Sequence, residues 1–188
     1  SPKTVVPMML GKEASHIDVV SGTARRIEDN KLEVRGLSYR VLFKDVNFDA
    51  YGGEVLGIGG LVGSGRSELL KCLYGSLQQD TGTVTLNGVP VSKSVAKNLK
   101  IGFAFVPEDR LGMGLVPAMN LMENAILKGY DTEAYSRNGI LNRKAVRKGT
   151  EGFIKRYGIK NGGMELPVSL MSGGNQQKLV LAREIQKK

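Results

Sequence analysis

The chain has 188 residues, of which 41% are hydrophobic and 24% are charged, a composition typical of one soluble globular domain. It contains no apolar run near the roughly 20 residues that span a bilayer, and the opening SPKTVVPMMLGKE lacks the apolar core of a secretory signal. The net charge of +9 leaves nucleic acids, nucleotides and anionic membrane surfaces open as partners.

Residues 1–30 predict a connector, because prolines and glycines interrupt them and no period is sustained. From Lys31 onward, KLEVRGLSYR and LFKDVNFDA alternate apolar and polar residues, as strands do. The apolar run at residues 54–60 predicts a buried strand, and SELLKCLYG, closed by Gly75, predicts a helix. The single cysteine, Cys72, excludes an internal disulfide and is expected to be a buried structural thiol on that helix.

The second half of the chain predicts further strands and helices. The pair Asn87-Gly88 between two alternating runs indicates a tight hairpin, and residues 101–106 predict another apolar strand. Asn120 and Glu123 have the spacing of a capping box at a helix start. Two later helices are expected from spacing, one with its apolar face at Val146, Thr150, Phe153, Ile154 and Tyr157, and one at Leu181, Ala182 and Ile185.

The loop GLVGSGRS lies between an expected strand and an expected helix, an order that aims free N–H groups and the positive helix end at an anion. Its glycines let the backbone curl closely around phosphate oxygens, and a serine hydroxyl at its end suits magnesium. The alternative is a glycine turn that serves only packing. The candidate nucleotide-binding residues are Gly60, Gly63, Ser64, Gly65, Arg66, Ser67 and Glu68.

Arg66 stands where the loop pattern G-x-x-x-x-G-K-[ST] has a lysine. Arginine keeps the charge but is longer, planar and forked, so it still neutralises phosphate. Phosphoryl transfer depends on positioning, so we expect binding to survive this substitution better than catalysis. The alternative is that arginine is an accepted equivalent of lysine.

A second glycine-rich helix start, MSGGNQQK, follows far along the chain. A serine and two glycines at the beginning of a helix predict another anion-binding end, with a plain N-cap by Ser172 as the alternative. A single active site seldom needs two such ends.

GLVGSGRSE followed by SGGNQQK resembles the nucleotide-binding domain of ATP-binding-cassette (ABC) transporters, and most closely the C-terminal cassette of ribose, galactose and xylose importers. The stretches GGEVLGIGGLVGSGRSELLKCLYG and VPEDRLGMGL agree with that resemblance. It implies an α/β P-loop NTPase with an N-terminal antiparallel β subdomain and a helical subdomain at about residues 112–171. Residues 1–30 would then be an inter-cassette linker or the tail of a preceding cassette, and residues 31–188 a partial nucleotide-binding domain that is incomplete at its C-terminus.

The resemblance also implies a mechanism in which two cassettes trap ATP and Mg²⁺ between them, head to tail. The glycine loop would hold one nucleotide, with Ser67 and Glu108 as metal candidates, Glu108 standing where other cassettes have a glutamine. Tyr39 is the candidate for stacking on adenine, with a core tyrosine as the open alternative. The signature residues that would face the γ-phosphate on the partner cassette are Ser172, Gly173, Gly174 and Gln176.

The expected partners are a second cassette and transmembrane permease subunits, and the expected location is peripheral, on the cytoplasmic face of the inner membrane. Between residues 133 and 160 the chain has eight Lys or Arg against two Glu, which favours a solvated helix face or an interface. Aromatic residues do not alternate with these cations, so no nucleic-acid partner is expected.

Complete cassettes have an apolar strand ending in Asp-Glu and a later histidine after the signature helix, and neither is present here. We therefore expect a fragment that exposes apolar surface and does not hydrolyse ATP alone, although the full-length protein would be an ATPase that drives carbohydrate import. One alternative is a non-catalytic nucleotide-binding or interaction module with a degenerate loop. A second alternative is a DNA-associated P-loop ATPase.

Overall fold

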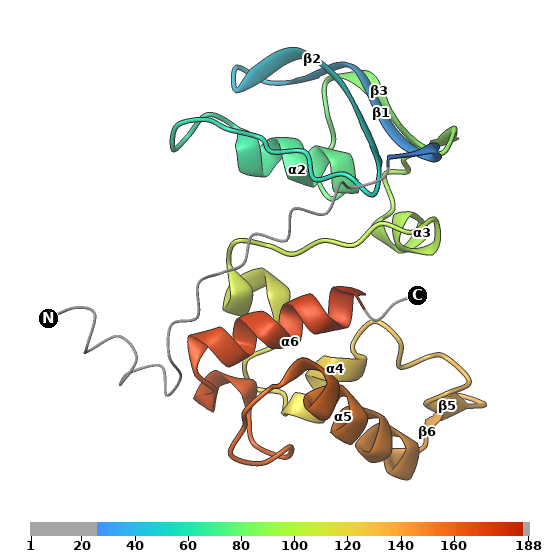
Figure 1. The fold of residues 1–188 in the computed structure, drawn as a ribbon, viewed down its shortest axis with the longest axis vertical. Coiled ribbons are helices and arrows are strands. Elements are labelled where there is room, and N and C mark those ends of the chain that lie inside the picture. The colour runs from blue at the N-terminus through green and yellow to red at the C-terminus, as the bar shows by residue number, and fades with distance from the viewer. Residues whose placement is uncertain (1–25, 186–188) are drawn as a thin grey trace, which may run out of the picture.

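The computed structural model describes residues 26–185, so the predicted connector lies almost wholly outside the described residues (Figure 1). The first strand, β1 (Ile27–Tyr39), begins before the predicted domain boundary at Lys31. None of the helices within the described range is long and apolar enough to cross a bilayer.

Four strands form an antiparallel sheet in the order β2-β1-β3-β4. β2 (Phe43–Gly52) and β3 (Thr81–Leu86) flank β1, and the short β4 (Val89–Pro90) forms the edge. The hairpin predicted at Asn87-Gly88 is confirmed, because Leu86 pairs with Val89 and the two turn residues have φ angles of 52° and 76°. The alternating stretches therefore form the N-terminal β subdomain.

Helix α2 (Arg66–Tyr74) packs against this sheet and ends at Gly75, whose φ of 77° is the left-handed conformation predicted for a helix terminator (Figure 1). The thiol of Cys72 is buried between helix and sheet, as predicted, and this burial raises its pKa. The shared core comprises Val34, Leu37, Tyr39, Leu69, Cys72, Leu73 and Val84.

The strands predicted at residues 54–60 and 101–106 are wrong, since neither segment is a strand in the structure. Both segments are apolar, but no strand within residues 26–185 pairs with their backbone. A segment becomes part of a sheet only when its backbone forms hydrogen bonds with a neighbouring strand. Val55 is 98% exposed, although the apolar run predicts burial. The predicted exposure of apolar surface is therefore present here, and it continues at Leu56, Leu61 and Val62.

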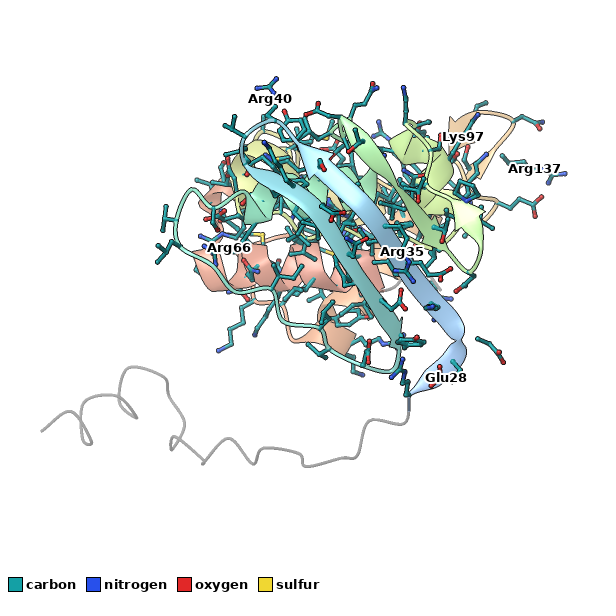
Figure 2. All side chains as sticks on the ribbon, turned by 90° about the horizontal axis from the view of Figure 1, so that it is seen from above. Glu28, Arg35, Arg40, Arg66, Lys97 and Arg137 are labelled. Atoms are coloured by element: carbon teal, nitrogen blue, oxygen red, sulfur yellow. The ribbon has the colours of Figure 1, made fainter. Side chains whose placement is uncertain are left out.

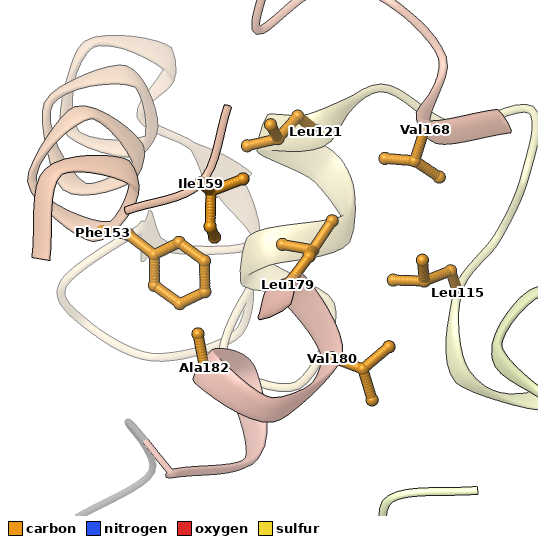
Figure 3. Packing of buried hydrophobic residues seen from close by; sticks show 8 residues of the cluster. All are labelled: Leu115, Leu121, Phe153, Ile159, Val168, Leu179, Val180 and Ala182. Atoms are coloured by element: carbon orange, nitrogen blue, oxygen red, sulfur yellow. The ribbon is translucent and has the colours of Figure 1, made fainter. Parts of the chain in front are cut away.

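The second half of the molecule is helical and packs around its own core (Figure 3). Its main elements are α4 (Leu121–Ile126), α5 (Arg143–Tyr157) and α6 (Gly173–Ile185). The remaining elements are short: α3 (Val95–Lys100), the π-helix η1 (Arg110–Gly114), the hairpin strands β5 (Ser136–Arg137) and β6 (Ile140–Leu141), and the 3₁₀ helix η2 (Val168–Leu170). The buried cluster is Leu115, Leu121, Phe153, Ile159, Val168, Leu179, Val180 and Ala182.

Several sequence predictions for this half are confirmed. Asn120 and Glu123 form the capping box of α4, and Val146, Thr150 and Phe153 are buried along α5. The apolar face predicted for α6 is only partly correct, because Ala182 is buried in the core whereas Leu181 and Ile185 are exposed. The other core-facing positions of this helix are 176, 179, 180 and 183.

A buried carboxylate joins the two halves. The Glu184 carboxylate on α6 accepts hydrogen bonds from Lys128 Nζ (2.5 Å) and from the backbone N–H of Phe105 (3.3 Å). The ring of Phe105 stacks on Tyr74 at the end of α2, with 4.8 Å between centroids. Burial and the nearby Glu184 carboxylate raise the pKa of Tyr74. The chain of contacts thus runs from α2 through residue 105 to α6.

Asn124 is a fully buried amide that fixes the loop before α4. Its Oδ1 accepts from the N–H of Val116 (2.9 Å), and its Nδ2 donates to the carbonyls of Val116, Met119 and Asn120 at 3.0–3.2 Å. Nothing in the sequence pattern signalled this role.

We expect Asn124→Ala to lower the free energy of unfolding by about 2–3 kcal/mol, because it strands a buried N–H and buried carbonyls without partners. Urea denaturation followed by circular dichroism measures the change. Asn30→Ala is the matched control, because Asn30 is exposed and makes no side-chain hydrogen bond within residues 26–185. Equal denaturation midpoints for the two variants would contradict the assigned role.

Charged side chains on β1 and β2 form a surface network. Asp49 forms ion pairs with Arg35 Nη1 (2.6 Å) and Lys31 Nζ (3.0 Å), and Lys31 also pairs with Glu33 (2.9 Å). Hydrogen bonds from Arg35 and then Lys31 lower the pKa of Asp49 to about 2, and the Lys31 ammonium lowers the pKa of Glu33.

Because the folded-state pKa of Asp49 is depressed, its stabilising effect is fully present above its unfolded pKa and is lost as the pH falls toward 2. We therefore expect Asp49→Asn to lower the melting temperature at pH 6, and the difference from wild type to shrink between pH 4 and pH 2. Calorimetry across that range measures it, with the exposed Asp131→Asn as control. A difference that stays constant with pH would refute the expectation.

Candidate nucleotide site

The glycine loop wraps onto the start of α2. Gly65 is the N-cap of α2 with φ 82°, and no side chain caps the first amides of the helix. A Cβ at this position would lie 3.1 Å from Leu42 Cβ and 3.2 Å from Phe43 Cδ1, so the turn between β1 and β2 leaves room only for glycine. The helix start is thus open to an anion, as predicted.

Gly60 lies close beneath two side chains of the loop. A Cβ there would lie 2.5 Å from Ser64 Oγ and 3.3 Å from Arg66 Cδ, so the loop folds back over this residue. The N–H of Ser64 donates to the carbonyl of Leu61 (3.1 Å), which holds the turn. The Arg66 side chain is exposed at this edge of the molecule (Figure 2).

The two predicted metal candidates lie together. Ser67 Oγ donates to Glu108 Oε2 at 3.3 Å, although 41 positions separate the residues in the chain. Asp109 holds the adjoining backbone, because its Oδ1 accepts from the N–H groups of Leu111 (3.1 Å) and Gly112 (2.9 Å).

An open cleft of about 720 Å³ lies beside this pair. It is bordered by the start of α2, by residues 105–109 and by the outer face of α6. The chemistry-bearing residues of its lining are Arg66, Ser67, Glu68, Lys71, Glu108, Asp109 and Gln177. A cleft with cations at the helix start and oxygen donors at its rim suits a phosphate ester with a hard cation.

No group of three or more His, Cys, Asp or Glu residues able to hold a metal occurs among residues 26–185. Magnesium, however, is commonly bound through one or two protein oxygens together with substrate phosphates. The hydroxyl of Ser67 and the carboxylate of Glu108 fit that donor set.

At the second glycine motif, Ser172 begins α6. Its carbonyl accepts from the N–H groups of Asn175 (2.9 Å) and Gln176 (3.0 Å), and its Oγ accepts from Asn175 Nδ2 (2.9 Å). A Cβ at Gly173 would lie 3.4 Å from Arg110 NH2. The segment from Glu108 to Arg110 therefore touches the phosphate loop at one end and the signature helix at the other.

Gln176 does not face outward, which corrects its predicted place beside a γ-phosphate. Its side chain is buried and donates from Nε2 to the carbonyl of Val168 (3.0 Å). The next residue, Gln177, lines the cleft instead. The signal for this existed in the sequence: position 176 shares the helical face of Leu179 and Val180, which are fully buried.

Tyr39 is not brought to the cleft. It is 7% exposed within the core, its ring lies 6.1 Å from that of Phe43, and the guanidinium of Arg40 lies 5.1 Å from its centroid. This placement favours the alternative interpretation, that Tyr39 is a core residue.

The ABC transporter family model matches residues 43–188. The chain belongs to the ABC transporter family. Two solved ABC structures share its fold, each at 21% sequence identity. One is cbiO1 from Clostridium perfringens, part of the ABC transporter complex cbiONQ, with a TM-score of 0.61 over 83% of this chain and 61% of cbiO1. The other is the ATP-binding cassette MJ0796, a dimer bound to ADP and Pi, with a TM-score of 0.62 over 83% of this chain and 69% of MJ0796. The fold is thus that of an α/β P-loop NTPase cassette.

Curated ABC relatives are similar over nearly the whole chain. The uncharacterized ABC transporter ATP-binding protein YphE of Escherichia coli is 36% identical over 95% of this chain and 35% of its own length. The ribose import ATP-binding protein RbsA 1 of Mesorhizobium japonicum is 37% identical over 97% of this chain and 36% of its own length. The arabinose import ATP-binding protein AraG of Rhizobium etli is 36% identical over 95% of this chain and 35% of its own length. The chain therefore spans about a third of the length of these relatives.

We expect Gly60→Ala in this ABC chain to weaken ATP binding by up to about tenfold, because the added methyl displaces the side chains of Ser64 and Arg66 from their places over the loop. Anisotropy titration of labelled ATP measures the affinity. Gly57→Ala is the matched control, since a Cβ there meets nothing within 4 Å. If both variants bind ATP alike, the loop does not hold phosphate.

Proposed function

We propose that this chain is the ATP-binding component of a bacterial sugar importer, and that it couples ATP binding and hydrolysis to carbohydrate uptake within the whole transporter. The hydrogen bond from Ser67 Oγ to Glu108 Oε2 (3.3 Å) carries the proposal, because it brings a loop hydroxyl and a distant carboxylate to one rim of the cleft. The relatives named for ribose and arabinose import support the sugar class.

In this proposal the triphosphate lies on the open amides at the start of α2, where Gly63 and Gly65 leave the backbone free of side-chain obstruction. Arg66 neutralises phosphate charge from the exposed edge of the loop. Ser67 and Glu108 would hold Mg²⁺, which neutralises charge on the phosphate oxygens. Glu68, in the first turn of α2, lines the same cleft.

The signature residues act in trans in this proposal. Ser172, Gly173 and Gly174 at the start of α6 would cap the nucleotide that is held by a partner cassette. The domain would comprise residues 31–188, with residues 112–171 as the helical subdomain that meets permease subunits. The assembly would be peripheral, on the cytoplasmic face of the inner membrane.

A second candidate function is a cassette that binds nucleotide without hydrolysing it. The forked Arg66 replaces a point charge, and the Glu108 carboxylate replaces an amide that also donates hydrogen bonds. Both changes preserve anion and metal contacts better than they preserve the placement that phosphoryl transfer needs.

We expect the chain to bind labelled ATP saturably in Mg²⁺ and more weakly in EDTA. Ser67→Ala should lower affinity about tenfold in Mg²⁺ and little in EDTA, because it removes a magnesium ligand. Ser76→Ala, an exposed serine after the other end of α2, should change neither value.

The absence of saturable binding would refute both candidate functions. Binding without phosphate release from the full-length protein and its permease would favour the second candidate, whereas magnesium-dependent release stimulated by the transported sugar would favour the first.

A further inference from the structure

The β5–β6 hairpin exposes two large apolar side chains that serve no core. Ile140 is 75% exposed and Leu141 is 46% exposed. The two strands form a separate two-stranded sheet, and neither residue belongs to a buried cluster. Exposed apolar pairs of this kind, on a short turn, have no structural explanation in the described part of the chain.

The hairpin is held in a fixed shape beside α5. Asn138 and Gly139 have φ angles of 52° and 78°, as a tight turn requires. At the base, the N–H of Asn142 donates to the carbonyl of Tyr135 (2.8 Å), while Asn142 Oδ1 caps α5 by accepting from Ala145 N (3.1 Å). Figure 1 shows the hairpin projecting from the helical half, beyond one end of α5.

Cations flank the apolar pair in the chain. Arg137, Arg143 and Lys144 are exposed and make no ion pair within residues 26–185. They belong to the stretch at residues 133–160 that has eight Lys or Arg against two Glu. Figure 2 shows Arg137 at the outer edge of the molecule.

The basic surface continues along α5. An open cleft of about 470 Å³ runs over the helix, with Lys148 and Arg156 among its lining residues and glycines in its floor. A Cβ at Gly149 would lie 2.7 Å from Tyr135 Oη, so the residue that leads into β5 packs against this cleft. The hairpin and the cationic cleft are therefore parts of one surface.

We propose that this surface, the β5–β6 hairpin with the basic face of α5, docks directly on an anionic lipid bilayer. Ile140 and Leu141 enter the interfacial layer, and the cations contact headgroup phosphates. A projecting apolar pair flanked in the chain by cations fits a soft anionic surface, and the eight Lys or Arg against two Glu at residues 133–160 complement its charge. The permease contact proposed above would then use other parts of residues 112–171. The proposal does not depend on the nucleotide cleft.

The test is flotation of the 188-residue chain with vesicles of 30% phosphatidylglycerol in phosphatidylcholine. We expect binding that falls with salt and is absent from pure phosphatidylcholine. The double change Ile140→Ser with Leu141→Ser should lower the partition coefficient about tenfold or more. Arg143→Gln with Lys144→Gln should lower it about twenty-five-fold, at about fivefold for each cation.

The matched control is Lys97→Gln with Lys100→Gln, which removes the same charge from α3, a helix that lies apart from the hairpin (Figure 1). This control should change binding by less than about twofold, and thermal unfolding should show that all variants fold. If the control variant loses as much vesicle binding, the protein's net charge alone explains the effect, and the assignment of this surface is overturned. Binding only to membranes that contain permease subunits, lost in the hairpin variant, would overturn it in favour of a protein partner.

Discussion

The arrangement of the whole molecule depends on the buried carboxylate of Glu184. A buried charge is tolerated only when it is paired and hydrogen-bonded, and Glu184 meets that condition with partners from three segments: Lys128, the adjacent Arg183 and the backbone of Phe105. Removing any one of these three partners leaves the Glu184 carboxylate without one of its hydrogen bonds. The segment that carries Glu108 is consequently tied to the helical half at one point and to α2, through Tyr74, at another.

This tie explains how a cleft forms between motifs that are distant in the chain. Residue 105 is fixed between α2 and α6, so the three residues before Glu108 have little freedom, and Glu108 reaches Ser67. Arg110 then extends to the start of α6 at Gly173. The same short segment therefore sets the distance between the glycine loop that we propose to bind phosphate and the helix that we propose to cap a neighbour's nucleotide.

The fold was predictable where local chemistry decides it. The capping box of α4, the Asn87-Gly88 turn and the glycine that ends α2 each depend on a few adjacent residues, and these three were recognised, whereas the cap of α5 by Asn142 was not. The conformation of residues 54–60 was predicted wrongly, because an apolar run becomes a strand only when it forms backbone hydrogen bonds with another strand. Gln176 was misplaced because a motif was read without the period of its helix, which turns position 176 inward and position 177 toward the cleft.

The sequence by itself determined the glycine loop at the start of α2, the second glycine motif at the start of α6 and the excess of positive charge around α5, because each is a property of neighbouring residues. Only the tertiary structure decided that Ser67 meets Glu108, that Tyr39 lies in the core and that Ile140 stands exposed among cations. Those facts follow from which distant segments bury their apolar faces together, and no stretch of residues contains that information alone.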